Sequence, residues 1–573
     1  MASVATILRD IFEDDDEDLE FDGFGPEDIE SDIDLNDVLN ELSTDDESEN
    51  EDEPRPGTNV LPPLGRPNVD DPEWSRDFSP ITVNAFVRET GPILPENFDV
   101  NSASPIDYFH IFFNENQFSA IARHTNNYAR WRLETENRGD PKWPDTNSAE
   151  IKAFIGINVL MGIQYMPETD MYWSSDDYLG NIGVKNVMPC NRFQKLSQYF
   201  HVSDRENEPV RGHENYDKLY KVRETIDHVS KTFLDRYRHS CNISVDEAMV
   251  KYTGRLSFRQ YMPAKPIKCG IKIWMRCDAE TAYLSRFQIY LGKKEGGVEH
   301  GLGYNVVTSL CDDIHYHNHH VYFDNYFTGV KLLEDLHDHG IYACGTCRSN
   351  RSGFPKEFKK PGKMNRGEYK VLQKGESNLV ATVWKDKKPV FNLSTLSDPE
   401  GEVRAARRVG ANVLDLPQPL TVYSYNKYMG GVDRQDQLRM AYDVGRASKR
   451  WWRYIFWFLV NCAIVNSFIV YKMVSKRQTK RKRYRHLDFK NELVRDLIGG
   501  YTTRKRQSQQ MDNPGIVLQE NVGGHINSRL PGPKRRCRFH LTAHKQRKET
   551  VYGCVVCGVH LCKDGCHNQF HVQ

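Results

Sequence analysis

The stretch Ile243-Ser-Val-Asp246-Glu247 and the two segments that follow it decide the fold. This short apolar run ends in carboxylates. Further on, the apolar residues Ile271, Ile273, Met275 and Cys277 alternate with Lys272, Trp274 and Arg276. That alternation is the period of a half-buried strand, and alternate residues at 283–291 predict the next strand. Adjacent strands with an aspartate at a strand end form a platform on which other acidic groups can converge.

Two later segments supply those acidic groups. Val321-Tyr-Phe-Asp324-Asn325 is a second apolar run that ends in aspartate. Gly430-Gly-Val-Asp433-Arg-Gln-Asp436 places two aspartates on one face at the start of a helix. Two divalent cations about 3.5–4 Å apart can bind the attacking and leaving oxygens of a phosphodiester, and Mg²⁺ prefers carboxylate ligands. Each aspartate alone is typical of a cap or a solvated turn. Only the set as a whole indicates metal-dependent phosphoryl transfer.

These segments resemble the motifs of piggyBac-family DNA transposases. The resemblance rests on five segments in the family's order, and it covers the chain from about residue 100 onward. They are residues 244–247, 254–272, 324–328, 345–351 and 430–437. The resemblance implies that Asp246, Asp324 and Asp433 are the catalytic triad of an RNase H-like fold that binds two Mg²⁺, or Mn²⁺ in their place. Asp436 would be the family's additional aspartate, one helical turn later.

The expected fold class is α+β and multidomain. An RNase H-like catalytic core with an inserted β-rich domain is flanked by a helical dimerisation and DNA-binding domain, as the resemblance implies. Asn147 and Glu150 predict the N-cap and capping box of a helix at 151–163, and apolar residues at 219–237 predict a long helix. The expected divisions begin with an acidic disordered tail at 1–60, a linker at 61–99 and the helical domain at 100–240. The core follows at 241–351 and 421–445, with the insertion at 352–420 between its two parts. Further helices and a basic run at 446–500, a linker at 501–532 and a cross-brace zinc domain at 533–573 complete the chain.

Charge is distributed unevenly along the chain. Residues 1–53 contain 23 Asp or Glu and one Arg, whereas the whole chain has a net charge of −2, so the body is net positive. This favours a polyanionic partner.

No signal peptide is evident at the acidic N-terminus, and the apolar stretch 451–470 contains Arg453 and Asn461, which suit a buried helix better than a membrane span. The basic run 476–483 fits a nuclear import signal, a DNA contact or both, and we expect a nuclear protein with no membrane association.

Basic and aromatic residues are interleaved between the first two aspartates. Basic side chains neutralise phosphates, and the aromatic residues Phe258 and Tyr261 could stack on unpaired bases. The resemblance adds two arginines that follow the second aspartate. The candidate DNA-binding residues are Arg255, Arg259, Lys265, Lys268, Lys272, Arg348 and Arg351.

The C-terminal segment carries the pattern of a zinc domain. Five of the 13 cysteines lie in the last 37 residues. Paired thiolate and imidazole ligands in a segment too small for its own core indicate two structural Zn²⁺ ions per chain. The pattern gives seven ligands, Cys537, His540, Cys554, Cys557, Cys562, Cys566 and His571. Two tetrahedral sites need an eighth ligand from His544, His560 or His567, and the resemblance favours His544.

The resemblance implies a cut-and-paste DNA transposase without a small-molecule substrate. Each transposon end would be nicked, and the freed 3′-hydroxyl would attack the opposite strand to close a hairpin. The ends would then join a TTAA target, and a homodimer would hold the two terminal inverted repeats. A second interpretation is a domesticated derivative that binds DNA in chromatin without transposition. A third is a RING-type protein-interaction or ubiquitin-ligase role for the C-terminal segment.

Overall fold

The computed structural model describes twelve stretches of the chain. They are residues 73–136, 139–140, 143–176, 178–210, 212–263, 265–292, 301–409, 412–475, 484–503, 525, 527–563 and 565–572. The chain divides into two compact units, residues 1–504 and 505–573. The expected acidic tail at 1–60, the basic run 476–483 and most of the expected linker at 501–532 lie outside the described residues.

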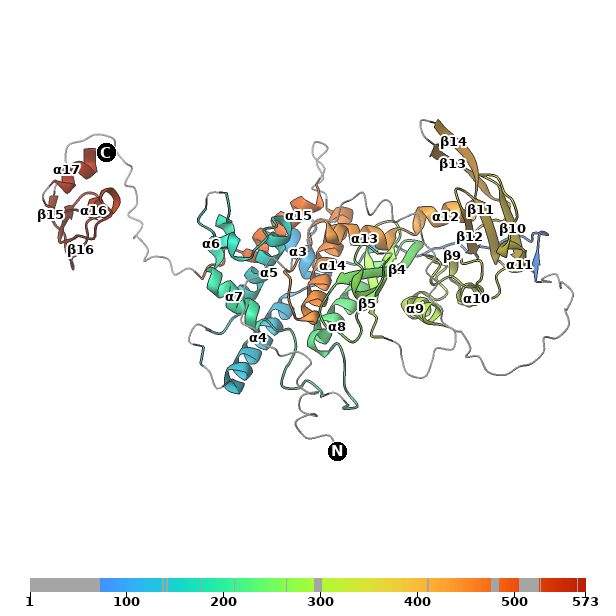
Figure 1. Ribbon diagram of the computed structural model, residues 1–573, viewed down its shortest axis with the longest axis horizontal. Helices are drawn as coiled ribbons and strands as arrows, with labels where there is room; N and C mark the ends of the chain where they lie inside the picture. The colour runs from blue at the N-terminus through green and yellow to red at the C-terminus, as the bar shows by residue number, and fades with distance from the viewer. Residues whose placement is uncertain are drawn as a thin grey trace. The chain divides into compact units, whose positions relative to one another are not determined.

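The first unit is built on a ten-stranded mixed sheet (Figure 1). The strand β4 (Asn242–Lys251) pairs antiparallel with β6 (Cys269–Asp278), which pairs antiparallel with β7 (Leu284–Ile289). On its other side β4 runs parallel to β8 (His320–Phe323), and β8 runs parallel to β9 (Tyr342–Thr346). These five strands therefore have the order β7-β6-β4-β8-β9. The strands expected at 271–277 and 283–291 are confirmed as β6 and β7.

The segment expected as an insertion, 352–420, extends this same sheet. Its strands β10 (Tyr369–Lys374), β11 (Val380–Lys385) and β12 (Pro389–Ser394) form an antiparallel meander, and β12 pairs antiparallel with β9. The short β1 (Trp74–Ser75) adds to β10, and β5 (Gln260–Tyr261) adds to β6. A separate hairpin consists of β13 (Glu402–Val409) and β14 (Asn412–Pro419).

The strand β6 is buried on both faces, so the expectation of a half-buried strand is wrong. Ile273 and Met275 face a core that includes helices α8 (Tyr220–Asp235) and α14 (Trp451–Val474). Trp274 faces a second core with α9 (Leu302–Leu310) and α10 (Val330–Asp338). Lys272 and Arg276 are also buried, at 8% and 0% exposure. The reason is that helices cover both sides of the central strands, which is typical where parallel strands form part of the sheet.

The helical part of the unit surrounds α14 (Figure 1). The predicted N-cap is confirmed, because the Asn147 side chain accepts a hydrogen bond from the Glu150 backbone at the start of α5. The predicted capping box is wrong, because the Glu150 side chain accepts hydrogen bonds from Thr146 and Arg192 instead. By length and composition alone α14 could cross a membrane, but 94% of its most apolar window is buried in the protein.

The remaining helices are α3 (Pro105–His110), α4 (Glu115–Thr135), α5 (Ser148–Ile163), η2 (Asp170–Trp173), α6 (Ile182–Val187), α7 (Cys190–Tyr199), η3 (Asp312–Ile314), α11 (Lys356–Lys359), α12 (Leu420–Tyr428), α13 (Gly431–Met440) and α15 (His486–Ile498). A two-residue ladder joins β2 (Gly91–Pro92) to β3 (Tyr237–Arg238).

The second unit is small and consists of short elements. The strands β15 (Asn527–Arg529), β18 (Tyr552–Cys554) and β19 (Val559–His560) form one sheet. A second sheet pairs β16 (Arg535–Arg536) with β17 (Glu549–Thr550). Two helices, α16 (Arg538–Ala543) and α17 (Cys566–Val572), complete the unit. Its apolar core is built mainly from cysteines with Phe539 and Leu561, so little of its stability can come from burial of apolar surface.

Asn466 of α14 pairs with the strand β7 as another strand would. Its Nδ2 donates to the Leu284 carbonyl at 2.8 Å, and its Oδ1 accepts from the Leu284 amide at 3.0 Å. We expect Asn466→Ala to lower the free energy of unfolding by about 2–4 kcal/mol, because two buried backbone groups lose their partner. Denaturant unfolding measures this. The control is Asn158→Ala, which removes a buried amide that donates within its own helix, to the Phe154 carbonyl. An equal loss in both variants would contradict the prediction.

Candidate active site and metal centres

Asp246 and Asp324 lie side by side in the sheet. The parallel register of β4 and β8 ends at the pair Val245 and Phe323, and the two aspartates are the next residues of their chains. Asp246 is 7% exposed, and Asp324 is partly buried. Each accepts a local backbone hydrogen bond, from Glu247 at 2.8 Å and from Tyr326 at 2.9 Å respectively. The fold therefore brings together two carboxylates that are 78 residues apart in sequence.

Burial and neighbouring negative charge oppose the ionisation of both groups. Burial, followed by the charges of Glu247 and Asp324, raises the pKa of Asp246 to about 8, although Lys265 acts in the opposite direction. Burial and the charge of Glu247 likewise raise the pKa of Asp324. A cation next to such carboxylates stabilises their ionised form and so lowers their pKa values.

Glu247 and Lys265 form an ion pair at the edge of this acidic pair. The Lys265 ammonium lies 2.9 Å from Oε1 of Glu247. Glu247 is 8% exposed, and its Oε2 accepts no hydrogen bond from the described residues. Burial lowers the pKa of Lys265, but Glu247, Asp246 and Asp324 together raise it. From the sequence alone Glu247 has no predicted role, and Lys265 is predicted only as a DNA-binding residue. The signal for Glu247 was its position next to Asp246.

Asp433 and Asp436 belong to α13, whose first residue, Gly431, packs against Ser244 near the start of β4. Asp433 is exposed. Asp436 is partly buried and accepts hydrogen bonds from the Arg439 guanidinium at 3.1 and 3.2 Å. Burial raises the pKa of Asp436, and Lys265 is among the cations that oppose the rise. Lys265 therefore acts electrostatically on carboxylates of β4, β8 and α13 alike.

The three aspartates of the expected triad are only partly gathered. Asp246 and Asp324 are adjacent, whereas Asp433 lies on the neighbouring helix. Within the described residues, these carboxylates do not form a group with ligand atoms within 4.8 Å of one another. The donor set nevertheless fits Mg²⁺, because it consists of hard carboxylate oxygens, and within the described residues Oε2 of the buried Glu247 beside it has no hydrogen-bond partner.

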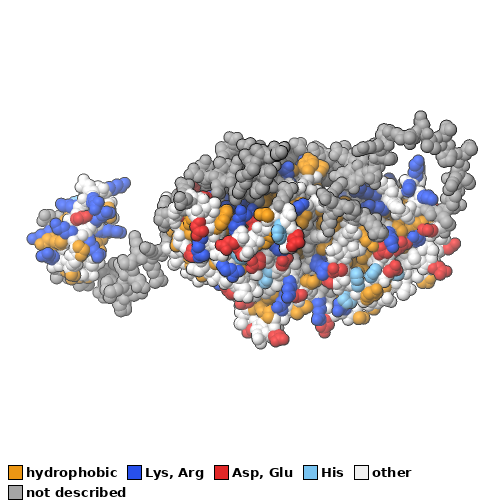
Figure 2. All heavy atoms as spheres, turned by 90° about the horizontal axis from the view of Figure 1, so that it is seen from below, with side chains coloured by type: hydrophobic (Ala, Val, Ile, Leu, Met, Phe, Trp, Pro, Cys, Tyr) orange, Lys and Arg blue, Asp and Glu red, His pale blue; other side chains and the backbone are white. Residues whose placement is uncertain are grey.

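The basic candidates separate into two groups. Arg255, Arg259 and Lys268 are exposed on the connection between β4 and β6, where they can reach a ligand. Lys272 is buried, with its ammonium 4.6 Å from the ring centroid of Tyr326. Figure 2 shows one face of the molecule, on which basic and acidic side chains are interspersed.

The two arginines after β9 support the loop that follows Asp324. Arg351 donates to the carbonyls of Asn325 and Tyr326, both at 2.7 Å, and Arg348 donates to the Asn325 side chain at 3.3 Å. Both therefore hold the chain next to the acidic pair. Their contact with DNA stays a prediction.

The expectation that Phe258 and Tyr261 both stack on bases needs correction for Phe258. Phe258 is 2% exposed and packs edge-on against Trp451 at a centroid distance of 5.5 Å. It therefore joins the strand connection to the helical core. Tyr261 is 65% exposed and stays available to a ligand.

The second unit contains two groups of metal-ligating side chains. The first is Cys537, His540, Cys562 and Cys566, and the second is His525, Cys554, Cys557 and His571. Nitrogen to sulfur distances within them run from 3.2 to 3.7 Å. Tetrahedral Zn²⁺ with ordinary bond lengths would separate such ligands by about 3.5 Å. The residues therefore fit two zinc ions, and the two groups interleave along the chain as in a cross-brace.

Neighbouring groups orient these ligands. The backbone amides of Cys562 and Cys557 donate to the sulfurs of Cys537 and Cys554, each at 3.4 Å. Nδ1 of His571 is 2.7 Å from the His567 carbonyl, which leaves its Nε2 facing Cys557. Such contacts typically fix the orientation of metal ligands.

The eighth ligand differs from the expectation. His525, not His544, completes the second group. His544 follows α16 and lies outside both groups, with its ring 5.7 Å from that of His540. His525 precedes the segment expected to form the domain, so ligand spacing within 533–573 gave no indication of it. The pairing of β15 with β18 brings this segment back beside Cys554.

Metal analysis of the full chain tests this assignment. We expect about two zinc ions per chain for the wild type and for His544→Ala, but close to one for His525→Ala, because only His525 belongs to a ligand group. Mass spectrometry of elemental zinc on the purified protein measures this. Loss of zinc from His544→Ala with full retention by His525→Ala would contradict the assignment.

Comparisons with known proteins agree with this architecture. The family model described as Transposase IS4 matches residues 104–468, more than half of the chain. PiggyBac transposable element-derived protein 5 of Homo sapiens is 27% identical over 70% of this chain and 76% of its own length. PiggyBac transposable element-derived protein 3 of Homo sapiens is 26% identical over 85% and 79% respectively. A cryo-EM structure of a piggyBac transposase synaptic complex with hairpin DNA is similar with a TM-score of 0.64 and 25% identity, over 83% of this chain and 98% of that chain. The chain therefore belongs to the piggyBac-type transposase IS4 family.

Proposed function

We propose that this protein is a metal-dependent DNA transposase that cleaves and joins phosphodiester bonds at the acidic pair of β4 and β8. The observation that carries the proposal is the adjacency of the buried Asp246 and the partly buried Asp324, two carboxylates whose pKa values are raised and whose ionisation a bound cation would favour. The strand order β7-β6-β4-β8-β9 supports an RNase H-like core, with three antiparallel strands followed by two parallel ones.

The proposed roles follow from the chemistry of the side chains. Asp246 and Asp324 would hold Mg²⁺, with Asp433 and Asp436 completing the site from α13. When bound there, the ions would activate a water or the 3′-hydroxyl of the cut strand as nucleophile and would stabilise charge on the leaving oxygen. Lys265 would provide positive charge close to the scissile phosphate. The exposed Arg255, Arg259 and Lys268 would bind the DNA backbone.

The finer details of the reaction follow from family membership and are part of the proposal. They are hairpin formation at the transposon ends, joining at TTAA, assembly as a homodimer and action in the nucleus. The similar solved complex supports the hairpin, because that transposase is bound to hairpin DNA. Zinc bound to the two interleaved ligand groups would stabilise the C-terminal unit, and this unit would bind the terminal inverted repeats.

A second candidate function is DNA binding without transposition. It is supported by the similarity to human proteins that are named as derived from piggyBac elements. The two candidates share DNA binding and differ in strand cleavage. A single assay that measures both therefore separates them.

The test uses the full chain with Mg²⁺ and a duplex that carries the inverted repeats flanking its reading frame, bordered by TTAA. We expect nicks and hairpin ends from the wild type. Asp324→Asn should slow cleavage on the order of 10²–10³-fold or more, because it removes charge that holds the metal, while DNA binding persists.

The matched control is Asp415→Asn on the exposed β14, which should cleave as the wild type does. Binding without cleavage by the wild type would favour the second candidate. Equal cleavage by the wild type and Asp324→Asn would reject this site as the source of the activity.

The ion pair of Glu247 and Lys265 generates a separate prediction. We expect Glu247→Gln and Lys265→Gln each to slow cleavage by about tenfold or more, and the double variant to be no slower than the worse single one, because the two residues act as a unit. Cleavage rates at saturating DNA measure this. Lys268→Gln, an exposed neighbour, should instead weaken DNA binding with a smaller salt dependence. Additive effects at 247 and 265 would show that the pair does not act together.

A further inference from the structure

The helix α13 approaches the strands so closely that a side chain on its first residue, Gly431, would displace a neighbour. A Cβ on Gly431 would lie 2.2 Å from Oγ of Ser244 and 3.1 Å from the carbonyl of Asp278. Ser244 is two residues before Asp246 on the same face of β4. The depth at which α13 docks therefore sets how far Asp433 and Asp436 stand from the acidic pair.

One side chain ties the start of α13 to the turn between β6 and β7. The Arg434 guanidinium donates from Nη2 to the carbonyl of Ala279 in that turn and from Nε to the carbonyl of Gly430 at 3.2 Å. Arg434 directly follows Asp433. The planar guanidinium can donate to both carbonyls at once, which a lysine ammonium at the end of a single flexible stem does less well.

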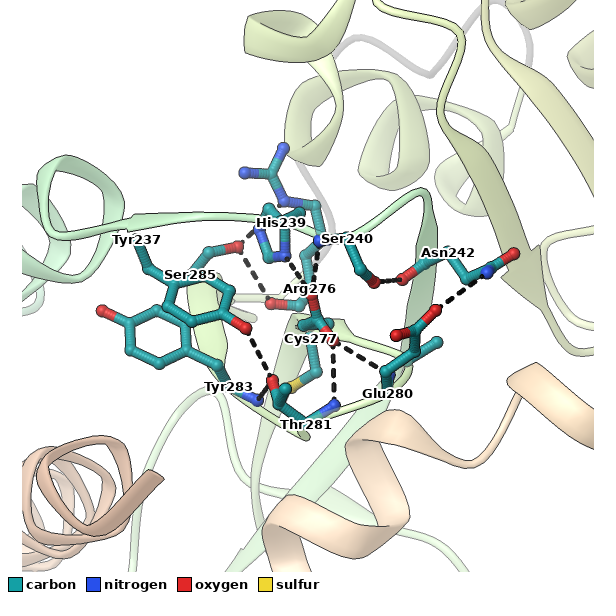
Figure 3. A network of polar contacts seen from close by, with 12 residues as sticks. Tyr237, His239, Ser240, Asn242, Arg276, Cys277, Glu280, Thr281, Tyr283 and Ser285 are labelled. Atoms are coloured by element: carbon teal, nitrogen blue, oxygen red, sulfur yellow. Dashed lines mark hydrogen bonds and ion pairs between the residues drawn. The ribbon is translucent and has the colours of Figure 1, made fainter. Parts of the chain in front are cut away.

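The turn that accepts this contact is itself rigid. The Asp278 carboxylate is fully buried and accepts backbone hydrogen bonds from Ser240 at 2.6 Å and from Glu280 and Thr281, both at 2.9 Å. Although burial acts in the opposite direction, His239 and these amides lower the pKa of Asp278, so it stays charged. Figure 3 shows Ser240, Glu280 and Thr281 grouped around this turn.

The same turn is joined to the strand that carries Asp246. The Ala279 amide donates to the Asn242 carbonyl at 2.9 Å. The Asn242 side chain donates to Glu280 at 3.3 Å (Figure 3). Asn242 is the first residue of β4. A continuous set of contacts thus runs from β4 through the turn to Arg434 and α13.

We propose that Arg434 is a positioning residue that sets the placement of Asp433 and Asp436 relative to Asp246 and Asp324. This inference rests on the proposed metal-dependent function. Arg434 is exposed, whereas the helix is held in the core by Val432, Gln435 and Arg439, which are 1%, 0% and 4% exposed. Loss of Arg434 therefore leaves α13 folded and releases mainly its first turn, where Asp433 is located.

The first measurement needs no DNA cleavage. Binding of Mn²⁺ to the full chain is followed by electron paramagnetic resonance. We expect Arg434→Gln to weaken the lower-affinity Mn²⁺ site about tenfold, because Asp433 is no longer held in place, while the thermal unfolding midpoint stays that of the wild type. Arg434→Lys should recover part of the affinity through a contact with Ala279.

The second measurement is the Mg²⁺ dependence of nicking. Arg434→Gln should raise the Mg²⁺ concentration for half-maximal rate about tenfold and lower the rate at saturating Mg²⁺ on the order of 10–100-fold, since small displacements of a reacting group are costly. Gly431→Ala should change both quantities in the same direction by forcing α13 away from Ser244. The control is Lys387→Gln, which removes an exposed cation at the turn between β11 and β12 and should change neither.

The outcomes separate this inference from the proposed function. If Arg434→Gln binds Mn²⁺ and responds to Mg²⁺ as the wild type does, the positioning role is overturned and the proposed function stands. A lower unfolding midpoint with unchanged Mn²⁺ affinity would also overturn it, because Arg434 would then be only a structural contact. If the wild type itself neither binds Mn²⁺ nor cleaves DNA, the proposed function fails first.

Discussion

The burial of two like-charged groups side by side is the constraint on which the first unit depends. Parallel pairing of β4 with β8 places Asp246 next to Asp324, away from water and close to Glu247. Two negative charges buried next to each other raise the free energy of the folded state unless nearby positive charge compensates for them. Part of that charge comes from Lys265 and Lys272, which belong to the connection and strand that follow β4. The chain itself therefore supplies positive charge next to the acidic pair.

Helices on both faces of the sheet and the loop after Asp324 hold this site in place. Helices α9 and α10 cover one face of the central strands, while α8 and α14 cover the other. The helix α13 approaches along the second face, and its closeness depends on Gly431 and on the rigid turn at Asp278. Arg348 and Arg351 fix the loop after Asp324. These residues take no part in the proposed reaction, but they determine how closely the acidic groups can approach one another. A small displacement of an acidic group changes the geometry in which it could bind a metal ion.

The terminal unit differs from the first in its core and in its clustered ligand groups. It lacks the apolar area of the first unit, and its two ligand groups interleave so that each joins chain segments that would otherwise separate. Metal binding to such a segment is coupled to its folding. The participation of His525 extends the module upstream of the segment that is dense in cysteine, and the strand β15 makes this possible by pairing with β18.

Local patterns in the sequence determined the strands β6 and β7, the N-cap at Asn147, the aspartates at strand ends and seven of the eight clustered ligands of the terminal unit. These signals are local because side-chain period, capping and ligand spacing act within a few residues. Tertiary structure alone decided that β6 is buried on both faces, that Phe258 packs on Trp451, that Lys265 pairs with Glu247 and that His525 replaces His544. Each of these outcomes depends on which distant segment packs against a residue, and spacing along the chain does not encode that contact.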